Sequence, residues 1–339
     1  MPPVLSRARF HELVNGFAGR QVVLYGDLVL DRFILGAPKR ISREAPVIIL
    51  RFEGQRDIPG GGANALANLA SLGGMPLPVG VVGDDEPGHA LLAGLRARGI
   101  DIGSILVAPG LRTVTKVRVL AGGATSLRHQ VARYDIEERL APDDTRLERV
   151  LDALRQVGGR AAAAAVSDYG YGAVWRSGLA TLRAALPAGA LIVVDSRFAL
   201  DSLAGVDGAT PNLEELAAAA GHDLSSDEEI GAAAEALRHK MGCRFLVATR
   251  GSQGSTLVEA GEPVRHLPVF GSDQVADVTG AGDTVLATLT LGLAAGASPV
   301  EAATLANLAG GIVVTKLGTA TVFPPELHRA IDQAPFLHD

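Results

Sequence analysis

Short runs of consecutive apolar residues alternate along the chain with longer segments in which apolar residues recur at helical spacing. The short runs occupy residues 22–25, 78–82, 161–166, 191–194 and 245–248. Strands that are apolar without alternation are typical of a parallel sheet covered on both faces. The segments predicted as helices are residues 63–72, 88–98, 145–156, 173–185, 212–220 and 226–240. This order predicts an α/β fold with a doubly wound, mainly parallel sheet sandwiched by helices.

Helix-capping patterns support several of these boundaries. Ser226 with Glu229, and Ser298 with Glu301, have the spacing of a capping box at the start of a helix. Residues 284–299 form an apolar segment that is short and interrupted by glycine. We therefore expect a buried core helix there and no membrane span.

Two segments lack this alternation and predict a second, smaller sheet. Residues 32–57 combine β-branched residues with loop residues, and residues 111–136 contain two β-rich runs. The two runs are joined by Ala-Gly-Gly-Ala at residues 121–124, and a Gly-Gly pair between strands is a hairpin signal. We expect both segments to form a small β-sheet lid on a single domain that spans residues 1–339, without an internal repeat.

Composition narrows the class of protein. The 339 residues carry a formal net charge of −6, which argues against a nucleic-acid-binding surface. The one cysteine, Cys243, lies in an apolar run, so we expect a buried thiol in a protein of the reducing cytoplasm. The first twenty residues lack the apolar core of a signal peptide. The eight histidines show no zinc-binding spacing.

The candidate chemistry is concentrated in the string Asp-Val-Thr-Gly-Ala-Gly-Asp-Thr at residues 277–284. Glycine lets the backbone approach a ligand closely, and the apolar run that follows predicts a helix whose first N–H groups point toward an anion. The N–H groups of Gly280, Ala281 and Gly282 would then form an anion hole. Asp283 would lie beside them as a general base that takes a proton from an attacking hydroxyl. The alternative is a glycine-rich turn in which Asp283 only caps a helix. The longer string, with Asp277 six residues upstream, favours the catalytic interpretation over the capping one.

Further strings occur in a fixed order along the chain. They are Gly-Asp-Leu-Val-Leu-Asp-Arg at residues 26–32, Arg-Ile-Ser-Arg-Glu-Ala-Pro-Val at 40–47, Pro-Gly-Gly-Gly-Ala-Asn at 59–64, Ser-Asp-Tyr at 167–169, Thr-Pro-Asn-Leu-Glu-Glu at 210–215 and Lys-Leu-Gly-Thr at 316–319. Together with residues 277–284 they resemble the PfkB/ribokinase family of sugar kinases. The strings at 40–47, 277–285 and 316–322 look most like the D-glycero-β-D-manno-heptose 7-phosphate kinases. That branch occurs alone or fused to a nucleotidyltransferase, and we expect only the kinase domain here.

Two positions differ from the strings of that branch. Tyr171 stands where Asp-Tyr-x-Lys-Gly would place a lysine, and Ser196-Arg197 stands where Asp-Pro-Lys would place proline and lysine. Those lysines are candidates to orient ATP or a substrate phosphate, so the identity of the sugar stays open.

The resemblance implies a ribokinase-like fold, ATP and Mg²⁺ as cofactors, and a lid that covers the sugar and forms a homodimer interface. It places the sugar at Asp31, Gly60, Gly61, Asn64 and Arg133. It places the nucleotide at Asn212, Glu215, Thr249, Gly251, Gly254, Asn307 and Gly310. Glu215 would act on Mg²⁺ through water, and Asp277 and Thr279 belong to loops that would hold a monovalent cation such as K⁺. Each of these assignments has a structural alternative. Asn212 and Glu215 could only cap a helix, Gly251 and Gly254 could only form a turn after a strand, and Asn307 and Gly310 could lie on a helix face of small residues that only packs.

A phosphate on the substrate would need basic side chains, and arginine suits bidentate phosphate recognition. The lid segments supply Arg32, Lys39, Arg40, Arg43, Lys116, Arg118, Arg128 and Arg133. The alternative is a basic loop that is only solvated.

The sequence thus predicts ATP-dependent phosphorylation of a sugar hydroxyl, and the resemblance points to the anomeric hydroxyl of D-glycero-β-D-manno-heptose 7-phosphate. A kinase for another sugar, sugar phosphate or nucleoside is the alternative within the class. A non-catalytic sugar-binding regulator is the alternative outside it. The chain lacks a P-loop string, and it lacks Gly-x-Gly-x-x-Gly after the first strand, which argues against a dinucleotide-binding dehydrogenase.

Overall fold

A nine-stranded sheet organises the computed structural model, which describes residues 6–122, 128–197, 200–203, 205–271 and 276–338. The strand order is β13-β12-β11-β10-β9-β8-β1-β4-β5. The strands from β11 to β5 are parallel, and β12 and β13 join antiparallel at one edge. The bounds are β1 (Gln21–Gly26), β4 (Met75–Gly83), β5 (Ile105–Ala108), β8 (Ala163–Asp168), β9 (Leu191–Ser196), β10 (Gly208–Ala209), β11 (Phe245–Thr249), β12 (Ser255–Glu259) and β13 (Arg265–Leu267).

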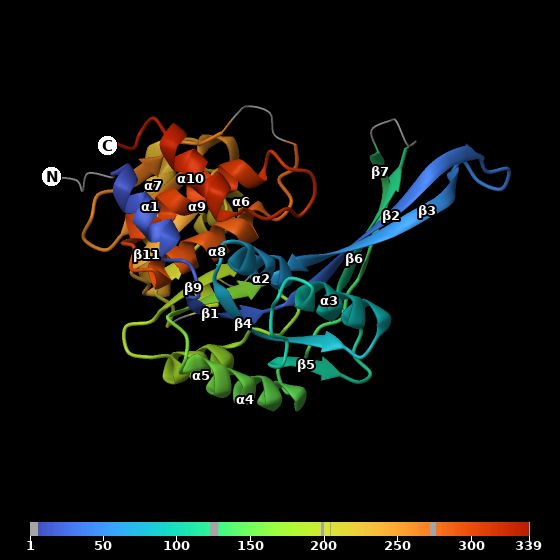
Figure 1. Ribbon diagram of the computed structural model, residues 1–339, viewed down its shortest axis with the longest axis horizontal. Coiled ribbons are helices and arrows are strands. Elements are labelled where there is room, and N and C mark those ends of the chain that lie inside the picture. Colours follow the sequence, from blue (N-terminus) through green and yellow to red (C-terminus); the bar gives the residue numbers. More distant parts are fainter. Residues whose placement is uncertain (1–5, 123–127, 198–199, 204, 272–275, 339) are drawn as a thin grey trace.

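Helices cover both faces of this sheet (Figure 1). One face packs against α1 (Arg7–Asn15), α2 (Gly62–Ser71), α3 (Glu86–Arg96), α8 (Ala281–Ala294), α9 (Pro299–Val313) and α10 (Pro324–Gln333). The other packs against α4 (Arg146–Gly158), α5 (Arg176–Ala185), α6 (Leu213–Ala220) and α7 (Asp227–Met241). Successive side chains of a strand point to opposite faces. In β1, accordingly, Val22 and Leu24 enter the first apolar cluster, while Val23 and Tyr25 enter the second.

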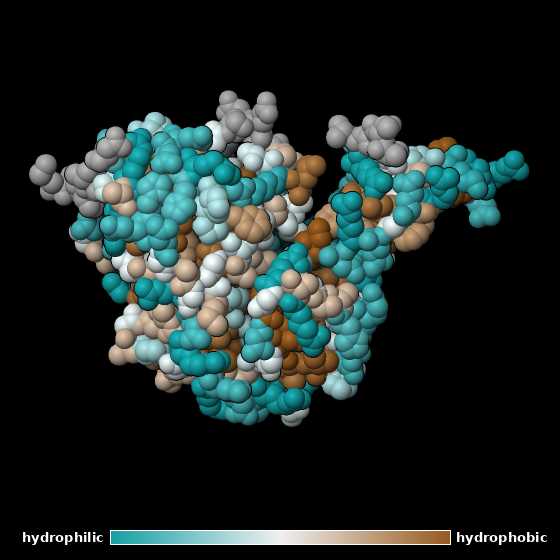
Figure 2. Space-filling model, in the orientation of Figure 1, coloured by the Kyte–Doolittle hydropathy of each residue, from teal (hydrophilic) through white to brown (hydrophobic). Residues whose placement is uncertain are grey.

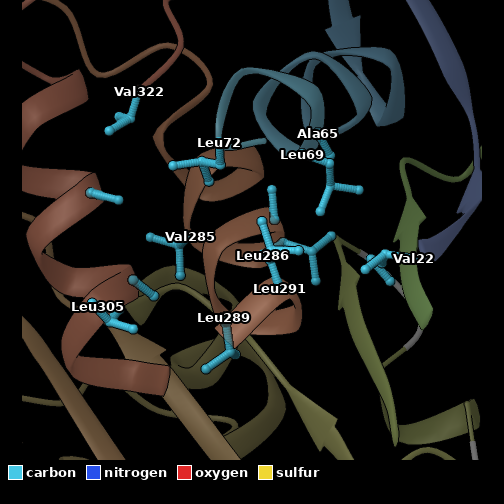
Figure 3. Close-up of a cluster of buried hydrophobic side chains, with 14 of the residues drawn as sticks. Val22, Ala65, Leu69, Leu72, Val285, Leu286, Leu289, Leu291, Leu305 and Val322 are labelled. Atoms are coloured by element: carbon cyan, nitrogen blue, oxygen red, sulfur yellow. The ribbon is translucent and has the colours of Figure 1, made fainter. Parts of the chain in front are cut away.

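Helix α8 lies at the centre of the first cluster (Figure 3). Leu286 and Leu289 on α8 pack with Leu69 on α2 and Leu305 on α9, and all four side chains are fully buried. Because α8 is apolar on every side, it is enclosed by other elements and its first turn is held rigidly.

The predicted architecture is confirmed. The five apolar runs coincide with β1, β4, β8, β9 and β11, and the six predicted helices coincide with α2 to α7. Both predicted capping boxes are present, and Cys243 is buried. Among the described residues, no helix is both long enough and apolar enough to cross a membrane.

The predicted lid is a separate four-stranded sheet with the order β3-β2-β6-β7. Its strands are β2 (Leu28–Ile41), β3 (Ile48–Gly61), β6 (Thr115–Ala121) and β7 (His129–Ile136). β2 pairs antiparallel with β3 and parallel with β6, and β6 pairs antiparallel with β7. The Gly-Gly turn predicted between β6 and β7 includes Gly123 and Ala124, which lie outside the described residues.

The lid starts at the carboxyl ends of the parallel strands, next to the interior strand β1, and projects away from the main body (Figure 1). β2 begins almost directly after β1, so its first residues lie at the carboxyl ends of the parallel strands. Further out, apolar side chains are exposed among polar ones (Figure 2). These exposed lid residues are Ile41, Val47, Ile48, Phe52, Val131 and Tyr134.

Candidate functional site

A polar cavity of about 380 Å³ lies where the lid meets the carboxyl ends of the parallel strands. This edge of an open α/β sheet is where ligands generally bind. The cavity is lined by Lys116, Arg118, Arg133, Tyr169, Asp195, Arg197, Thr210, Asn212, Glu215, Thr249, Val278, Thr279, Gly280, Gly282 and Asp283. The lid supplies the basic side chains of Lys116, Arg118 and Arg133, while the main sheet and its helices supply acidic side chains and one further basic residue, Arg197, directly after β9.

Asp283 lies in the first turn of α8, and its side chain is held from two directions. The residue is only 2% exposed. Its Oδ2 accepts a hydrogen bond from Asn64 Nδ2 at 2.9 Å, and its Oδ1 accepts one from the Tyr169 hydroxyl at 2.8 Å. The carboxylate thus has a fixed orientation in the cavity.

Burial raises the pKa of Asp283 to about 6, because the charged form loses its hydration. The hydrogen bonds from Asn64 and Tyr169 act in the opposite direction, since they stabilise the charged form. A carboxyl group with this pKa is mostly ionised at neutral pH and still basic enough to accept a proton. This is the balance that a general base requires.

The backbone before Asp283 can adopt its shape only with glycine at the helix start. Gly280 has a φ of 80°, and a Cβ there would lie 2.5 Å from Asn64 Nδ2. The N–H of Ala281 donates to the Val278 carbonyl oxygen at 3.2 Å, so it is directed away from a ligand. Of the three N–H groups predicted to form an anion hole, those of Gly280 and Gly282 therefore remain the candidates.

The residues predicted to bind the sugar lie together at the base of the lid. Asp31 in β2 is 3% exposed and accepts a hydrogen bond from Arg118 at 2.7 Å in an ion pair. A Cβ at Gly60 would lie 2.6 Å from Asp31 Oδ2, so glycine makes room for this carboxylate. Asn64 contacts Asp283, and Arg133 lines the cavity while bonding to Asp135.

Only part of the predicted basic cluster lies at this cavity. Arg32 is ion-paired with Asp57 and Glu86 outside it. Lys39, Arg40 and Arg43 are exposed on the outer part of the lid, and Arg128 pairs with Glu53. The cavity is instead lined by Lys116, Arg118, Arg133 and Arg197. The outer lid residues are correspondingly poor candidates for contact with a substrate phosphate.

Lys116 and Arg197 are the cations of the cavity that lack an ion-pair partner within the described parts of the chain. Lys116 Nζ lies 4.9 Å from the centre of the Tyr169 ring, and Arg197 Cζ lies 4.6 Å from it. Burial lowers the pKa of Lys116, and the nearby charge of Arg197 lowers it further. Asp31 and Asp135 lie near enough to Lys116 to raise its pKa, but neither forms an ion pair with it. Two neighbouring cations that are not neutralised by direct ion pairs favour an anionic ligand at this position.

A second cavity of about 280 Å³ adjoins the first and is mostly apolar. Thr249, Val278 and Gly282 line both. The apolar cavity is further lined by Gly251, Ser252, Gly254, Val269, Phe270, Gly271, Ala281, Val285, Asn307, Gly310, Gly311 and Val314. Most residues predicted to bind the nucleotide are thus brought together, and the mostly apolar lining suits an apolar base.

Asn212 and Glu215 form a capping box at the start of α6, as their structural alternative predicted, and both also line the polar cavity. Capping therefore does not exclude a binding role. Asn307 lines the apolar cavity and donates a hydrogen bond to the Pro268 carbonyl oxygen at 2.6 Å.

Asp195 at the end of β9 is a cavity residue that the sequence analysis did not select. Burial, together with the negative charges of Glu215 and Asp283, raises the pKa of Asp195 to about 8. A divalent cation carried in with nucleotide phosphates would relieve this repulsion, so Asp195 and Glu215 fit the outer surroundings of Mg²⁺. The described residues contain no group of three or more His, Cys, Asp or Glu side chains arranged to hold a metal directly.

The loops predicted to hold a monovalent cation are joined by Asp277. Its carboxylate accepts a hydrogen bond from Thr279 N at 2.9 Å and another from Gly318 N at 3.1 Å. Asp277 therefore fixes the two loops relative to each other, which leaves backbone carbonyl groups as the candidate cation ligands.

The chain is similar in sequence to known carbohydrate kinases over most of its length. The pfkB family carbohydrate kinase profile matches residues 20–326. The Bifunctional protein HldE of Mesorhizobium japonicum is 39% identical over 332 residues, which cover 97% of this chain and 65% of that protein. The chain therefore spans about 65% of the length of the curated relatives it matches.

Solved structures show the same fold at low sequence identity. Arabidopsis thaliana ribokinase complexed with ribose and ATP superposes with a TM-score of 0.66 and 22% identity, over 93% of this chain and 98% of that one. Escherichia coli phosphofructokinase-2 in complex with potassium gives a TM-score of 0.73 and 21% identity, over 93% and 99% of the two chains. The predicted ribokinase-like fold is thus confirmed.

The environment of Asp283 predicts an unusual titration. Carbon-13 NMR of labelled aspartate carboxyl groups should show Asp283 titrating near pH 6. Asn64→Leu removes a donor to the charged form, so the pKa should rise further. Asp85 serves as the control, because hydrogen bonds from Thr113 and Gly88 outweigh its burial and lower its pKa. An Asp283 signal that titrates in the ordinary range for aspartate, or that ignores Asn64→Leu, would contradict this description.

Proposed function

This chain belongs to the pfkB family of carbohydrate kinases, and from that premise we propose that it phosphorylates the anomeric hydroxyl of D-glycero-β-D-manno-heptose 7-phosphate with ATP. The observation that carries the proposal is the position of Asp283. This buried carboxylate lines the polar cavity beside Gly282, where that cavity adjoins an apolar cavity suited to a nucleotide base. Lys116 and Arg197 line the same polar cavity without an ion-pair partner in the described parts of the chain. The resemblance of the sequence strings to the heptose 7-phosphate kinase branch supports the choice of sugar.

The proposed reaction is an in-line transfer. Asp283 takes the proton of the acceptor hydroxyl as its oxygen attacks the γ-phosphorus of ATP, and the bond between that phosphorus and the bridging oxygen of ADP breaks. N–H groups in the first turn of α8 stabilise the charge on the transferred phosphoryl group. Phosphoryl transfer depends mainly on such positioning and charge neutralisation. Mg²⁺ supplies further neutralisation of the phosphates when it is bound.

The residues of the chain divide between the two substrates. Asn64 contacts Asp283, and the charge of Asp31 is near enough to raise the pKa of Asp283. Asp31 would accept hydrogen bonds from sugar hydroxyls, and Asn64 would exchange hydrogen bonds with them. Lys116 and Arg197 would bind the substrate's own phosphate, with Arg133 nearby. Tyr171, at one of the positions that differ from the heptose kinase strings, does not line this cavity, and its hydroxyl donates to Glu137 at 2.8 Å.

The alternatives remain distinguishable by experiment. A kinase for another sugar phosphate or a nucleoside would use the same base with a different acceptor. A non-catalytic sugar-binding regulator would have no need for the buried Asp283 and its two hydrogen-bond donors. A coupled assay of ADP formation with heptose 7-phosphate, fructose phosphates, ribose and nucleosides separates these possibilities.

Asp283→Asn keeps the size of the side chain but removes the base. We expect kcat to fall by about 10²–10⁴-fold, the usual contribution of a positioned general base, with ATP affinity little changed. Asp223→Asn, the same change at an exposed position, is the control and should retain wild-type kcat. Retention of most of the wild-type kcat by Asp283→Asn would exclude this residue as the base.

Lys116→Ala tests recognition of the substrate phosphate. One charge-assisted hydrogen bond contributes about 1.5–3 kcal/mol, so kcat/KM for heptose 7-phosphate should fall about ten- to a hundredfold. The kcat/KM for the unphosphorylated heptose should hardly change. Lys39→Ala on the outer lid is the matched control and should leave both values unaltered. Equal losses for the two sugars would place Lys116 away from the phosphate.

We also propose that two copies associate through their lids. The exposed lid residues, including Phe52 at 67% exposure, would become covered in such a homodimer. Light scattering at micromolar concentration should give twice the mass of the chain, and Phe52→Asp should shift the population toward the monomer because it would bury a charge. A monomeric wild-type protein would count against this assembly.

A further inference from the structure

Tyr169 is the second donor to the Asp283 carboxylate, and neither the family resemblance nor the proposed reaction gives it a role. Its hydroxyl donates to Asp283 Oδ1 at 2.8 Å, opposite the Asn64 donor on Oδ2. Rotation of the carboxylate about its last side-chain bond would break both hydrogen bonds. Each oxygen nevertheless keeps one lone pair free for a substrate hydroxyl.

The position of Tyr169 is itself fixed by Asp27, which follows β1. Asp27 is 3% exposed and accepts hydrogen bonds from three backbone N–H groups of the loop after β8. The donors are Tyr169 N at 2.8 Å, Tyr171 N at 3.0 Å and Ala173 N at 3.1 Å. A loop attached at three points to one buried carboxyl group has little freedom to move.

The ring of Tyr169 is also closely surrounded. A Cβ at Gly61 would lie 3.3 Å from its Cε2, so the glycine turn that ends β3 leaves just enough space for the ring. Lys116 and Arg197 both lie over the ring as cation–π partners. Burial raises the pKa of Tyr169 well above its ordinary value, so the hydroxyl remains protonated and can donate.

We propose that Tyr169 is a positioning residue for the general base: its hydroxyl holds the Asp283 carboxylate toward the acceptor hydroxyl, while Asp27 and the two cations hold Tyr169. The inference rests on the proposed function, because Asp283 must be the group that takes the proton. Tyr169 transfers no proton itself, since it stays a donor to Asp283 throughout the reaction.

Tyr169→Phe removes the hydroxyl and keeps the ring between its neighbours. We expect kcat to fall about ten- to a hundredfold, the range for loss of a hydrogen bond to a charged group. KM values for ATP and for the sugar should change less than about threefold, because the ring and its cation contacts remain. A residue that only supports the fold would instead alter KM and thermal stability together with kcat.

Tyr171→Phe is the matched control in the same loop. Its hydroxyl donates to Glu137 at 2.8 Å, away from the base, so the same chemical deletion should leave kcat at the wild-type value. Asp283→Asn provides the second comparison, since residues that act through one another are not additive. Adding Tyr169→Phe to Asp283→Asn should lower the residual kcat no further.

Carboxyl carbon-13 NMR gives a readout that does not depend on turnover. Tyr169→Phe should shift the Asp283 signal, and Tyr171→Phe should not. A wild-type protein that phosphorylates no sugar, with the Asp283 signal still shifted by Tyr169→Phe, would refute the proposed function while leaving the contact in place. An active wild-type enzyme whose kcat is equally unaffected by both Phe substitutions would overturn the positioning role. If Tyr169→Phe lowers kcat by the same factor in the Asp283→Asn variant as in the wild type, the positioning role is overturned as well.

Discussion

The Asp283 carboxyl group is buried away from water and yet mostly ionised at neutral pH. The rest of the site is arranged around that balance. Burial alone would favour the neutral acid, whereas the hydrogen bonds from Asn64 and Tyr169 favour the charged form. The result is a pKa of about 6, which leaves a usable base near neutral pH. Because the two donors come from α2 and from the loop after β8, the base depends on tertiary structure as a whole.

The architecture explains how these distant segments meet. Helix α8 is enclosed on all sides, so its first turn cannot move independently of α2, α9 and the strands beneath it (Figure 3). The parallel strands direct their carboxyl ends to the same edge, where Asp27 fixes the loop that carries Tyr169. The lid then closes the cavity from the other side and contributes Lys116 and Arg118 from β6. The buried Asp283 carboxylate and the basic side chains of the lid therefore line one cavity.

Much of this could be predicted from the sequence. Continuous apolar runs identified the central parallel strands, because burial on both faces leaves no polar position in them. The Gly-Ala-Gly-Asp string indicated the helix start, since a positive φ at Gly280 and an anion site share the same requirement for glycine. Edge strands such as β13 were missed, because three residues carry too little pattern to be recognised.

The basic residues show where sequence reasoning reached its limit. Arg32 and Lys116 are both basic residues of the predicted lid segments, and the sequence does not distinguish their roles. Arg32 is ion-paired with Asp57 and Glu86, whereas Lys116 lines the cavity and has no ion-pair partner among the residues that the structure describes. The roles of Asp195 and Tyr169 depend on distances between segments that are far apart in the chain. The most direct test of the central claim is phosphorus-31 NMR of the product formed from ATP, Mg²⁺ and heptose 7-phosphate. Our account predicts one ADP per sugar and a new phosphate signal coupled to the anomeric proton. Hydrolysis of ATP without a new sugar phosphate, or no ADP at all, would contradict it.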